Sequence, residues 1–241
     1  MKLYRIIILF VLFINFACKN KKEVNIYSNK TINTDTSNVI KTCNCFDGIG
    51  SKMGDTPTMI LTFSNGQSIS VCGYLDKEMQ GNIISEFNVF DCNSGKVISE
   101  YDAMQICRII PKKDTLIIQA LKYLPTGKNW KWNLIQLGEE IITIKDKKII
   151  STGIKPKLEK FSINENEANF YLNSLTKGKG HNKEWELEIG KLEVLTLLGY
   201  KKAKIILENY EEYTGQETDG AVAETWKDAV STTQWINKNC N

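Results

Sequence analysis

The sequence predicts an α+β protein in which an antiparallel β-rich domain precedes a helical C-terminal portion. Two patterns lead to this prediction. Between about residues 57 and 161, short apolar segments alternate with turn residues, which is typical of antiparallel strands. From about residue 162, apolar residues recur every three or four positions, which is typical of amphipathic helices. A chain of 241 residues, of which 42% are hydrophobic, is long enough to bury its own core.

The first residues have the layout of an export signal. Lys2 and Arg5 precede an unbroken apolar run over residues 6–14, and the small residue Ala17 follows. The run is too short to span a bilayer, because a membrane-spanning helix needs about 20 apolar residues. A positive head, a short apolar stretch and a small residue are together typical of a secretory signal peptide. We therefore expect residues 1–17 to be removed.

The end of this signal carries a more specific pattern. The stretch Ile14-Asn15-Phe16-Ala17-Cys18 resembles the lipobox of bacterial lipoproteins. In that family the cysteine receives acyl chains such as palmitate, and the signal is cut just before it. The resemblance therefore implies that Cys18 anchors the protein to a membrane.

The residue after the cysteine bears on which bacterial membrane would hold the protein. Lys19 stands where lipoproteins kept at the inner membrane often have Asp. The resemblance thus implies an outer-membrane lipoprotein that faces the periplasm. It covers the signal alone and implies nothing about the mature domain.

The residues after the signal suggest four segments. Residues 18–42 are rich in Lys, Asn, Ser and Thr and keep no period of 2 or 3.6, which indicates a flexible tether. The predicted organisation is a signal peptide over 1–17, a lipidated tether over 18–42, an antiparallel β domain over 43–161, and a helical portion over 162–241 packed on or beside the sheet.

Seven cysteines are present, and six remain when the lipidation site is set aside. In an exported protein, an even number favours disulfides over a metal site or a reactive thiol. Cys43 and Cys45 are too close in an extended chain to bond comfortably to each other, so each is expected to pair elsewhere. Six cysteines allow fifteen pairings. The disulfide candidates are Cys43, Cys45, Cys72, Cys92, Cys107 and Cys240.

Turn residues divide the β domain into hairpins. Asn65-Gly66 and Ser94-Gly95 suit the positive φ angles of tight turns. Residues 111–114 and 146–147 supply two further turns. The predicted strands cover residues 59–63, 68–74, 83–92, 96–101, 104–110, 115–124, 130–137, 140–145 and 148–152.

The helical portion opens with a capping signal. Ser162 and Glu165 have the spacing of a capping box, which predicts a helix through about Leu175. Three apolar stripes at helical spacing follow, and we expect them to pack as core. They consist of Trp185, Ile189, Leu192 and Leu195, then Ala203, Ile206, Tyr210 and Tyr213, then Val222, Trp226, Val230 and Thr233.

Composition argues against several function classes. The 31 basic and 28 acidic residues nearly balance, which argues against nucleic-acid binding driven by bulk charge. The single histidine, His181, excludes sites that need two histidines. We recognise no catalytic set, metal site or cofactor motif. The leading prediction is a non-enzymatic envelope protein that binds a protein partner as an accessory or a protector.

Trp130 and Trp132 suggest an alternative. They alternate along a predicted strand and would therefore point to the same side. Two neighbouring rings could stack against a carbohydrate or another small ligand, or could instead fill the core.

A third hypothesis is a carboxylate-based hydrolase. Such an enzyme needs two carboxyl groups about 5–10 Å apart. The candidates on or near predicted strands are Asp47, Asp76, Glu86, Asp91, Glu100, Asp102, Glu139 and Glu140.

Overall fold

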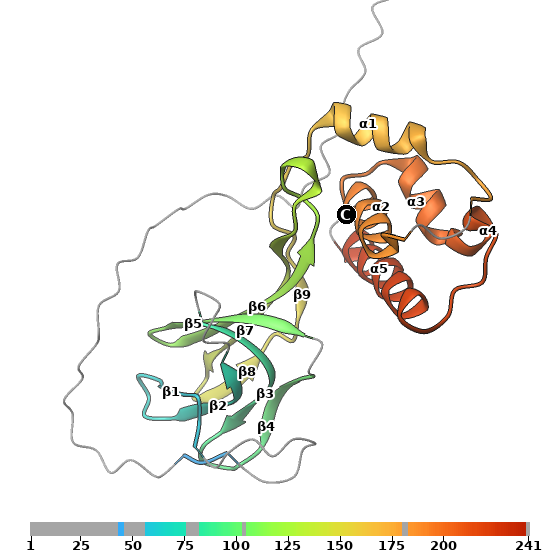
Figure 1. Ribbon diagram of the computed structural model, residues 1–241. Coiled ribbons are helices and arrows are strands. Elements are labelled where there is room, and N and C mark those ends of the chain that lie inside the picture. Colours follow the sequence, from blue (N-terminus) through green and yellow to red (C-terminus); the bar gives the residue numbers. More distant parts are fainter. Residues whose placement is uncertain (1–42, 46–55, 76–81, 103–104, 180–182, 240–241) are drawn as a thin grey trace, which may run out of the picture.

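The computed structural model describes residues 43–45, 56–75, 82–102, 105–179 and 183–239 (Figure 1). Within these ranges nine strands precede five α-helices, so the predicted α+β class is confirmed. Cys18, the tether over 18–42, His181 and Cys240 lie outside the described residues. The elements are β1 (Met59–Thr62), β2 (Ser68–Leu75), β3 (Ile83–Asp91), β4 (Val97–Tyr101), β5 (Ile106–Lys112), β6 (Thr115–Leu124), the 3-10 turn η1 (Lys128–Trp130), β7 (Asn133–Lys145), β8 (Lys148–Ser151), β9 (Lys155–Pro156), α1 (Glu165–Ser174), α2 (Trp185–Leu197), α3 (Lys201–Glu208), α4 (Tyr210–Thr214) and α5 (Gly220–Asn239).

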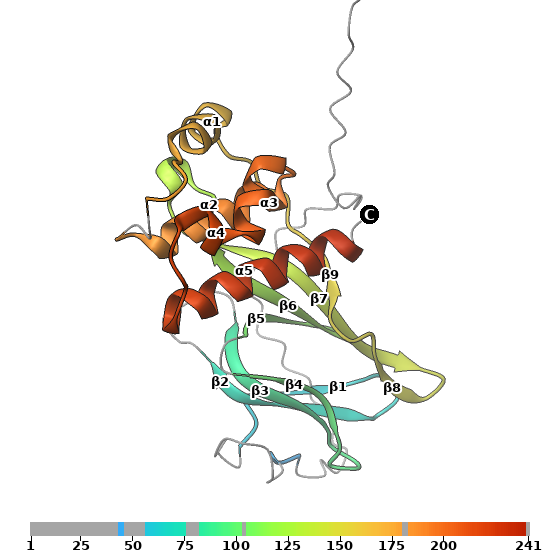
Figure 2. The same cartoon turned by 90° about the vertical axis from the view of Figure 1, so that its right-hand side faces the viewer.

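All strand pairs are antiparallel, and the sheet follows the order β1-β2-β3-β5-β6-β7-β8. Strand β4 also pairs with β3, and β9 pairs with β7. The sheet is strongly folded, with β1–β4 on one side and β5–β7 on the other (Figure 2). Apolar side chains from both sides form one core. They include Ile69, Val71, Ile84, Phe87, Val89, Cys107, Ile109, Leu116, Ile118 and Ile142.

Strand β7 is continuous where the sequence predicted two strands over 130–137 and 140–145. The pairing with β6 shifts between Ala120 and Leu121, so β7 carries an extra residue just before Gly138. This bulge explains the break in the apolar pattern without ending the strand. Glycine is required at that position, because a Cβ on Gly138 would lie 2.7 Å from Cη2 of Trp235.

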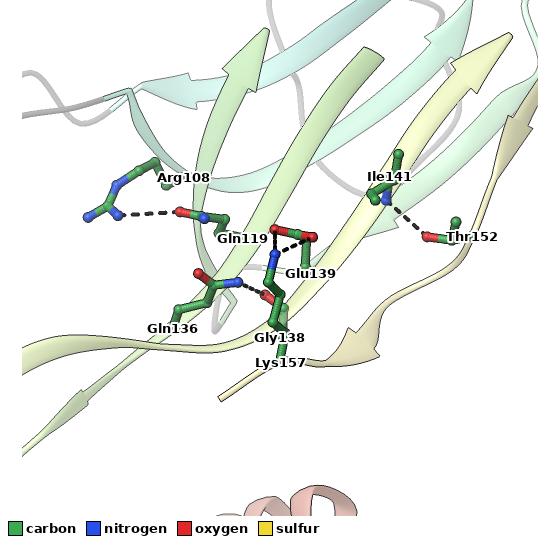
Figure 3. A network of polar contacts seen from close by, with 8 residues as sticks. All are labelled: Arg108, Gln119, Gln136, Gly138, Glu139, Ile141, Thr152 and Lys157. Carbon is green, nitrogen blue, oxygen red and sulfur yellow. Dashed lines mark hydrogen bonds and ion pairs between the residues drawn. The ribbon is translucent and has the colours of Figure 1, made fainter. Parts of the chain in front are cut away.

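Polar contacts hold the chain as it leaves β8 and runs back along β7 (Figure 3). The backbone N–H of Ile141 donates to Thr152 Oγ1 at 2.9 Å. Lys157 Nζ donates to both carboxylate oxygens of Glu139, at 2.8 and 2.7 Å. The short strand β9, which sequence analysis missed, lies between these two contacts and pairs with Gly138 and Glu139.

The helices differ from expectation at their ends. Asn164 caps α1 by accepting hydrogen bonds from the N–H groups of Asn166 and Glu167, so the predicted box of Ser162 and Glu165 is wrong. Asn164 lies one residue before the helix and therefore reaches its unpaired N–H groups. The stripe that starts at Ala203 is divided into α3 and α4. Among the described residues, no helix combines the length and apolar character needed to cross a membrane.

The helices pack at one end of the sheet, beside the extension of β6 and β7 (Figure 1). Leu124 and Leu137 from these strands meet Val194 of α2 and Ile236 of α5 in a shared apolar cluster. A second cluster, centred on the buried ring of Tyr210, joins the helices to one another. The sheet end is therefore part of the helical core.

A buried ion pair crosses the same junction. Lys122 Nζ on β6 lies 2.7 Å from Glu193 Oε1 on α2 and 2.6 Å from Asp228 Oδ2 on α5. The Glu193 side chain is 3% exposed, and burial raises the pKa of its carboxyl above the usual value despite the ammonium beside it. Burial acts to lower the pKa of Lys122, but the two carboxylates outweigh it and raise that pKa. The two elements thus share charges that neither could bury alone.

Among the described cysteines, four form two disulfides, Cys43–Cys92 and Cys45–Cys72. As expected, Cys43 and Cys45 each pair elsewhere. Cys107, a predicted disulfide candidate, is instead a free and fully buried thiol. It belongs to the inner core of the sheet, whereas Cys72 alternates with the core residue Val71 and so points to the opposite face.

We predict that Lys122→Met lowers the free energy of unfolding by about 3–5 kcal/mol, because Glu193 would remain buried without its cation. Urea denaturation at neutral pH measures this loss. Lys177→Met is the matched control, since it breaks an exposed ion pair with Glu212 and should cost less than about 1 kcal/mol. The double variant Lys122→Met/Glu193→Met should recover most of the loss. Equal losses in the two single variants would contradict the prediction.

We also predict that Cys107 resists alkylation in the folded protein. Burial, followed by the nearby carboxylates of Glu140 and Asp102, raises the pKa of its thiol to about 12, and the thiolate is the reactive form. Peptide mass mapping after iodoacetamide treatment at pH 8 should find this residue unmodified in native protein and modified in urea. Rapid native alkylation would show that the site is open to solvent.

Candidate functional site

The helical portion contains a cleft of about 720 Å³ between α1 and α2. We call it the α1–α2 cleft. Its aromatic lining comes from three separate segments, namely the η1 turn, α1 and α4, through Trp130, Phe170, Tyr171 and Tyr213. Its charged lining consists of Glu167, Lys179, Glu184, Glu188 and Lys191. Aromatic surfaces and several charges of both signs therefore face one open cleft.

The η1 turn reaches this cleft because it forms the tip of the long β6–β7 hairpin. Asn129 and Trp130 both have positive φ, at 56° and 60°. Such angles are unusual for residues other than glycine. The N–H of Gly127 donates to the carbonyl of Lys131 at 2.9 Å and closes the loop around them. The hairpin thus places the Trp130 ring, which belongs to the β domain in sequence, among the helices.

The Trp130 ring lies against α1 and α2. Its centroid is 5.8 Å from that of Tyr171, with the ring planes tilted by 60°. The ammonium of Lys191 on α2 lies 5.4 Å from the Trp130 centroid and 5.0 Å from the Tyr171 centroid. Both distances are in the range of cation–π attraction. The Tyr171 hydroxyl donates to the backbone carbonyl of Glu188 at 3.1 Å, which fixes its ring on α2.

Electrostatics in the cleft follow from partial burial beside carboxylates. Burial lowers the pKa of Lys191, and Glu184 and Glu188 act against that change. Burial also raises the pKa of the Tyr171 hydroxyl, with a further contribution from Glu188. At neutral pH the tyrosine is therefore a neutral hydrogen-bond donor.

The structure separates the two tryptophans that sequence analysis grouped. Strand β7 begins at Asn133, so neither Trp130 nor Trp132 lies on a strand, and the alternation that paired them is wrong. The positive φ angles of the η1 turn break the extended backbone there. Trp130 lines the cleft. Trp132 is 41% exposed and packs against α2, where a Cβ on Gly190 would lie 3.0 Å from its ring.

The other cleft residues were missed. Phe170 is 78% exposed although it is large and apolar. It falls outside the stripe of α1 that buries Ala168 and Leu172, and this mismatch is the signal that sequence analysis could have used. Lys191 and Glu188 carried no such signal, because charged residues on a helix are ordinarily solvated.

Among the described residues, the strand acids proposed for a hydrolase do not line the cleft. Glu139 pairs with Lys157. Glu140 is buried within the folded sheet and accepts hydrogen bonds from the hydroxyls of Ser99, Tyr101 and Ser151. Burial and this carboxylate raise the pKa of Tyr101 far above its usual value. Glu140 therefore has a structural environment of hydroxyl donors inside the sheet.

Two further strand acids lie next to each other, since the backbone N–H of Glu86 donates to the carbonyl of Asp102 at 3.3 Å. Asp91 accepts from the backbone of Asn93 and the hydroxyl of Ser94 in a turn. Asp47 and Asp76 lie outside the described residues. In the part of the chain that the structure describes, no group of three or more His, Cys, Asp or Glu side chains is placed to hold a metal ion.

Comparison with known proteins adds no assignment. The chain matches no protein-family model, no curated protein and no solved structure. The α1–α2 cleft is therefore the basis for any assignment of function.

Proposed function

We propose that this chain is a lipid-anchored binding protein of the bacterial envelope, and that its ligand occupies the α1–α2 cleft. One observation carries the proposal: aromatic side chains from three separate segments line a single cleft of about 720 Å³. This volume lies within the range of sites that bind small ligands, about 300–1,000 Å³. Rings on several walls offer a ligand contact area at little conformational cost.

Phe170 supports a binding role. Phe170 is 78% exposed, so its ring contributes little to the core, and it lines the cleft. Exposed aromatic rings at a concave site are typical of contacts that become buried when a ligand or partner binds. The ring is thus available to cover a bound molecule.

The position of the N-terminal disulfides suits an anchored protein. Cys43 and Cys45 form disulfides with Cys92 and Cys72. The segment 43–45, drawn in blue, lies on the β2–β4 side of the sheet, away from the helices (Figure 2). A tether from Cys18 to this point, about 24 residues long, would have a typical reach of roughly 25–30 Å. Under this proposal the sheet lies nearer the membrane and the cleft faces away from it.

A protein partner is the second candidate for the occupant. It is favoured by two large apolar residues on the helices, Phe170 and Ile205, which are 78% and 62% exposed. Aromatic residues are enriched at protein interfaces. We favour a small ligand over a protein partner, because the cleft by itself offers a concave site and Ile205 does not line it.

The proposal predicts that a small molecule stays with the protein when it is isolated gently from its own envelope. Native mass spectrometry should detect this molecule on the wild type and on Ile205→Ala, and should find it largely lost from Phe170→Ala. Both substitutions remove an exposed apolar side chain, so they should alter stability by similarly small amounts.

Two results would argue against the cleft as the binding site. Equal retention in both variants would exclude Phe170 from the contact. A stoichiometric protein recovered by cross-linking, with no small molecule on the wild type, would favour the second candidate. Loss of that protein on Ile205→Ala would then locate its surface on α3.

A further inference from the structure

The ammonium of Lys191 shows what kind of group the aromatic walls accept. It lies 5.4 and 5.0 Å from the ring centroids of Trp130 and Tyr171. Aromatic faces attract cations because the ring quadrupole places negative charge above and below the plane. Two rings that belong to different segments thus converge on one positive charge. Such a cage is a recognised way of binding organic cations, including quaternary ammonium groups.

Lys191 is held weakly in this position. Lys122, Lys157 and Lys177 each form an ion pair within 3 Å. Among the described residues, the Lys191 ammonium forms neither a hydrogen bond nor an ion pair, and its contacts are with the two rings. A flexible lysine side chain that makes no direct ion pair can swing into solvent at low cost.

The charges around the cage favour a cation over an anion. The cleft is lined by three carboxylates, from Glu167, Glu184 and Glu188, and by two ammonium groups, from Lys179 and Lys191. If Lys191 moves out, one ammonium remains against three carboxylates. Glu184 and Glu188 already act on the charge of Lys191, so they would act in the same way on a cation that replaced it.

We propose that the α1–α2 cleft binds an organic cation, with its amine or quaternary ammonium group between Trp130 and Tyr171, and that Lys191 occupies this place when no ligand is bound. The inference rests on the proposed function and names the chemistry of its ligand. The cation can be a free small molecule or the side chain of a lysine on a partner protein. Lys191 acts as an internal competitor that a ligand must displace.

The first test is titration calorimetry of the full lipidated chain in a non-ionic detergent. The probes are choline, as a small quaternary cation, and Nα-acetyl-lysine amide, as a protein-like lysine. Lys191→Ala should bind its preferred probe about two- to fivefold more tightly than the wild type, because a competing cation–π contact is removed. Lys191→Arg keeps a cation and should bind like the wild type. Lys177→Ala, which removes an exposed lysine that does not itself line the cleft, is the matched control.

The identity of the better probe distinguishes the two sources. Tighter binding of choline would assign a free small cation, and tighter binding of the lysine amide would assign a partner protein. Trp130→Leu in the Lys191→Ala background should abolish binding of either probe. Since this substitution also removes core contacts, a second readout that needs no variant accompanies it.

That readout is the reactivity of Lys191 in the wild type. A bound cation should expel its amine into solvent, so acetylation of Lys191 by an activated ester should become faster when the probe is added. Acetylation of Lys177 should not change. Peptide mass spectrometry measures both rates.

Several results would overturn the inference. Weaker or unchanged affinity of Lys191→Ala for both probes is one such result, and failure of every variant to bind either probe is another. Binding of acetate by the wild type and its loss from Lys191→Ala would identify Lys191 as an anchor for anions. If the ligand retained from the envelope still depends on Phe170 in these cases, the cation assignment fails while the cleft remains the binding site.

Discussion

The ion pair between Lys122 and Glu193 determines how the sheet meets the helices. A charge buried without a partner is costly, and here the sheet supplies the cation while α2 supplies the carboxylate. Asp228 of α5 completes the group, so three elements must meet at one point. The apolar cluster around Leu124, Val194 and Ile236 joins the same strands and helices, and Glu193 is the buried member of the charged group. The charges make the arrangement specific, while apolar burial supplies most of its stability.

The α1–α2 cleft depends on this junction, because part of it belongs to the sheet. The β6–β7 hairpin extends past the ion pair and ends in the turn that carries Trp130. Gly190 on α2 allows the approach, since a Cβ there would lie 3.0 Å from the Trp132 ring and 3.1 Å from Pro125. A shift of the hairpin relative to α2 would therefore separate Trp130 from Tyr171 and Lys191. Under the proposed function, the contacts that stabilise this junction also position the binding site.

Different interactions stabilise the two ends of the described structure. The N-terminal end is fixed by disulfides, which restrict the unfolded chain and suit an oxidising compartment. The helical end holds its cleft through packing and charge, and it leaves Phe170 uncovered. Covalent constraint at Cys43 and Cys45, together with an exposed aromatic ring on the helices, fits the proposal of a protein that is held through its N-terminal side and binds a ligand at its helical end.

The sequence alone determined the features that depend on neighbouring residues. Alternation and turn residues located most strands, including the tight turn at Asp146 and Lys147 with its two positive φ angles. Helical spacing located α2 and α5, although α2 is buried on more sides than one stripe and α5 also buries Ala223, Ala229 and Ile236. The tertiary structure alone decided the disulfide partners, the burial of Cys107, the continuity of β7 past Gly138, and the cleft itself. The cleft brings together residues from separate elements, namely Trp130, Tyr171 and Lys191. A local sequence pattern cannot predict this contact, because it forms only when the hairpin packs against the helices.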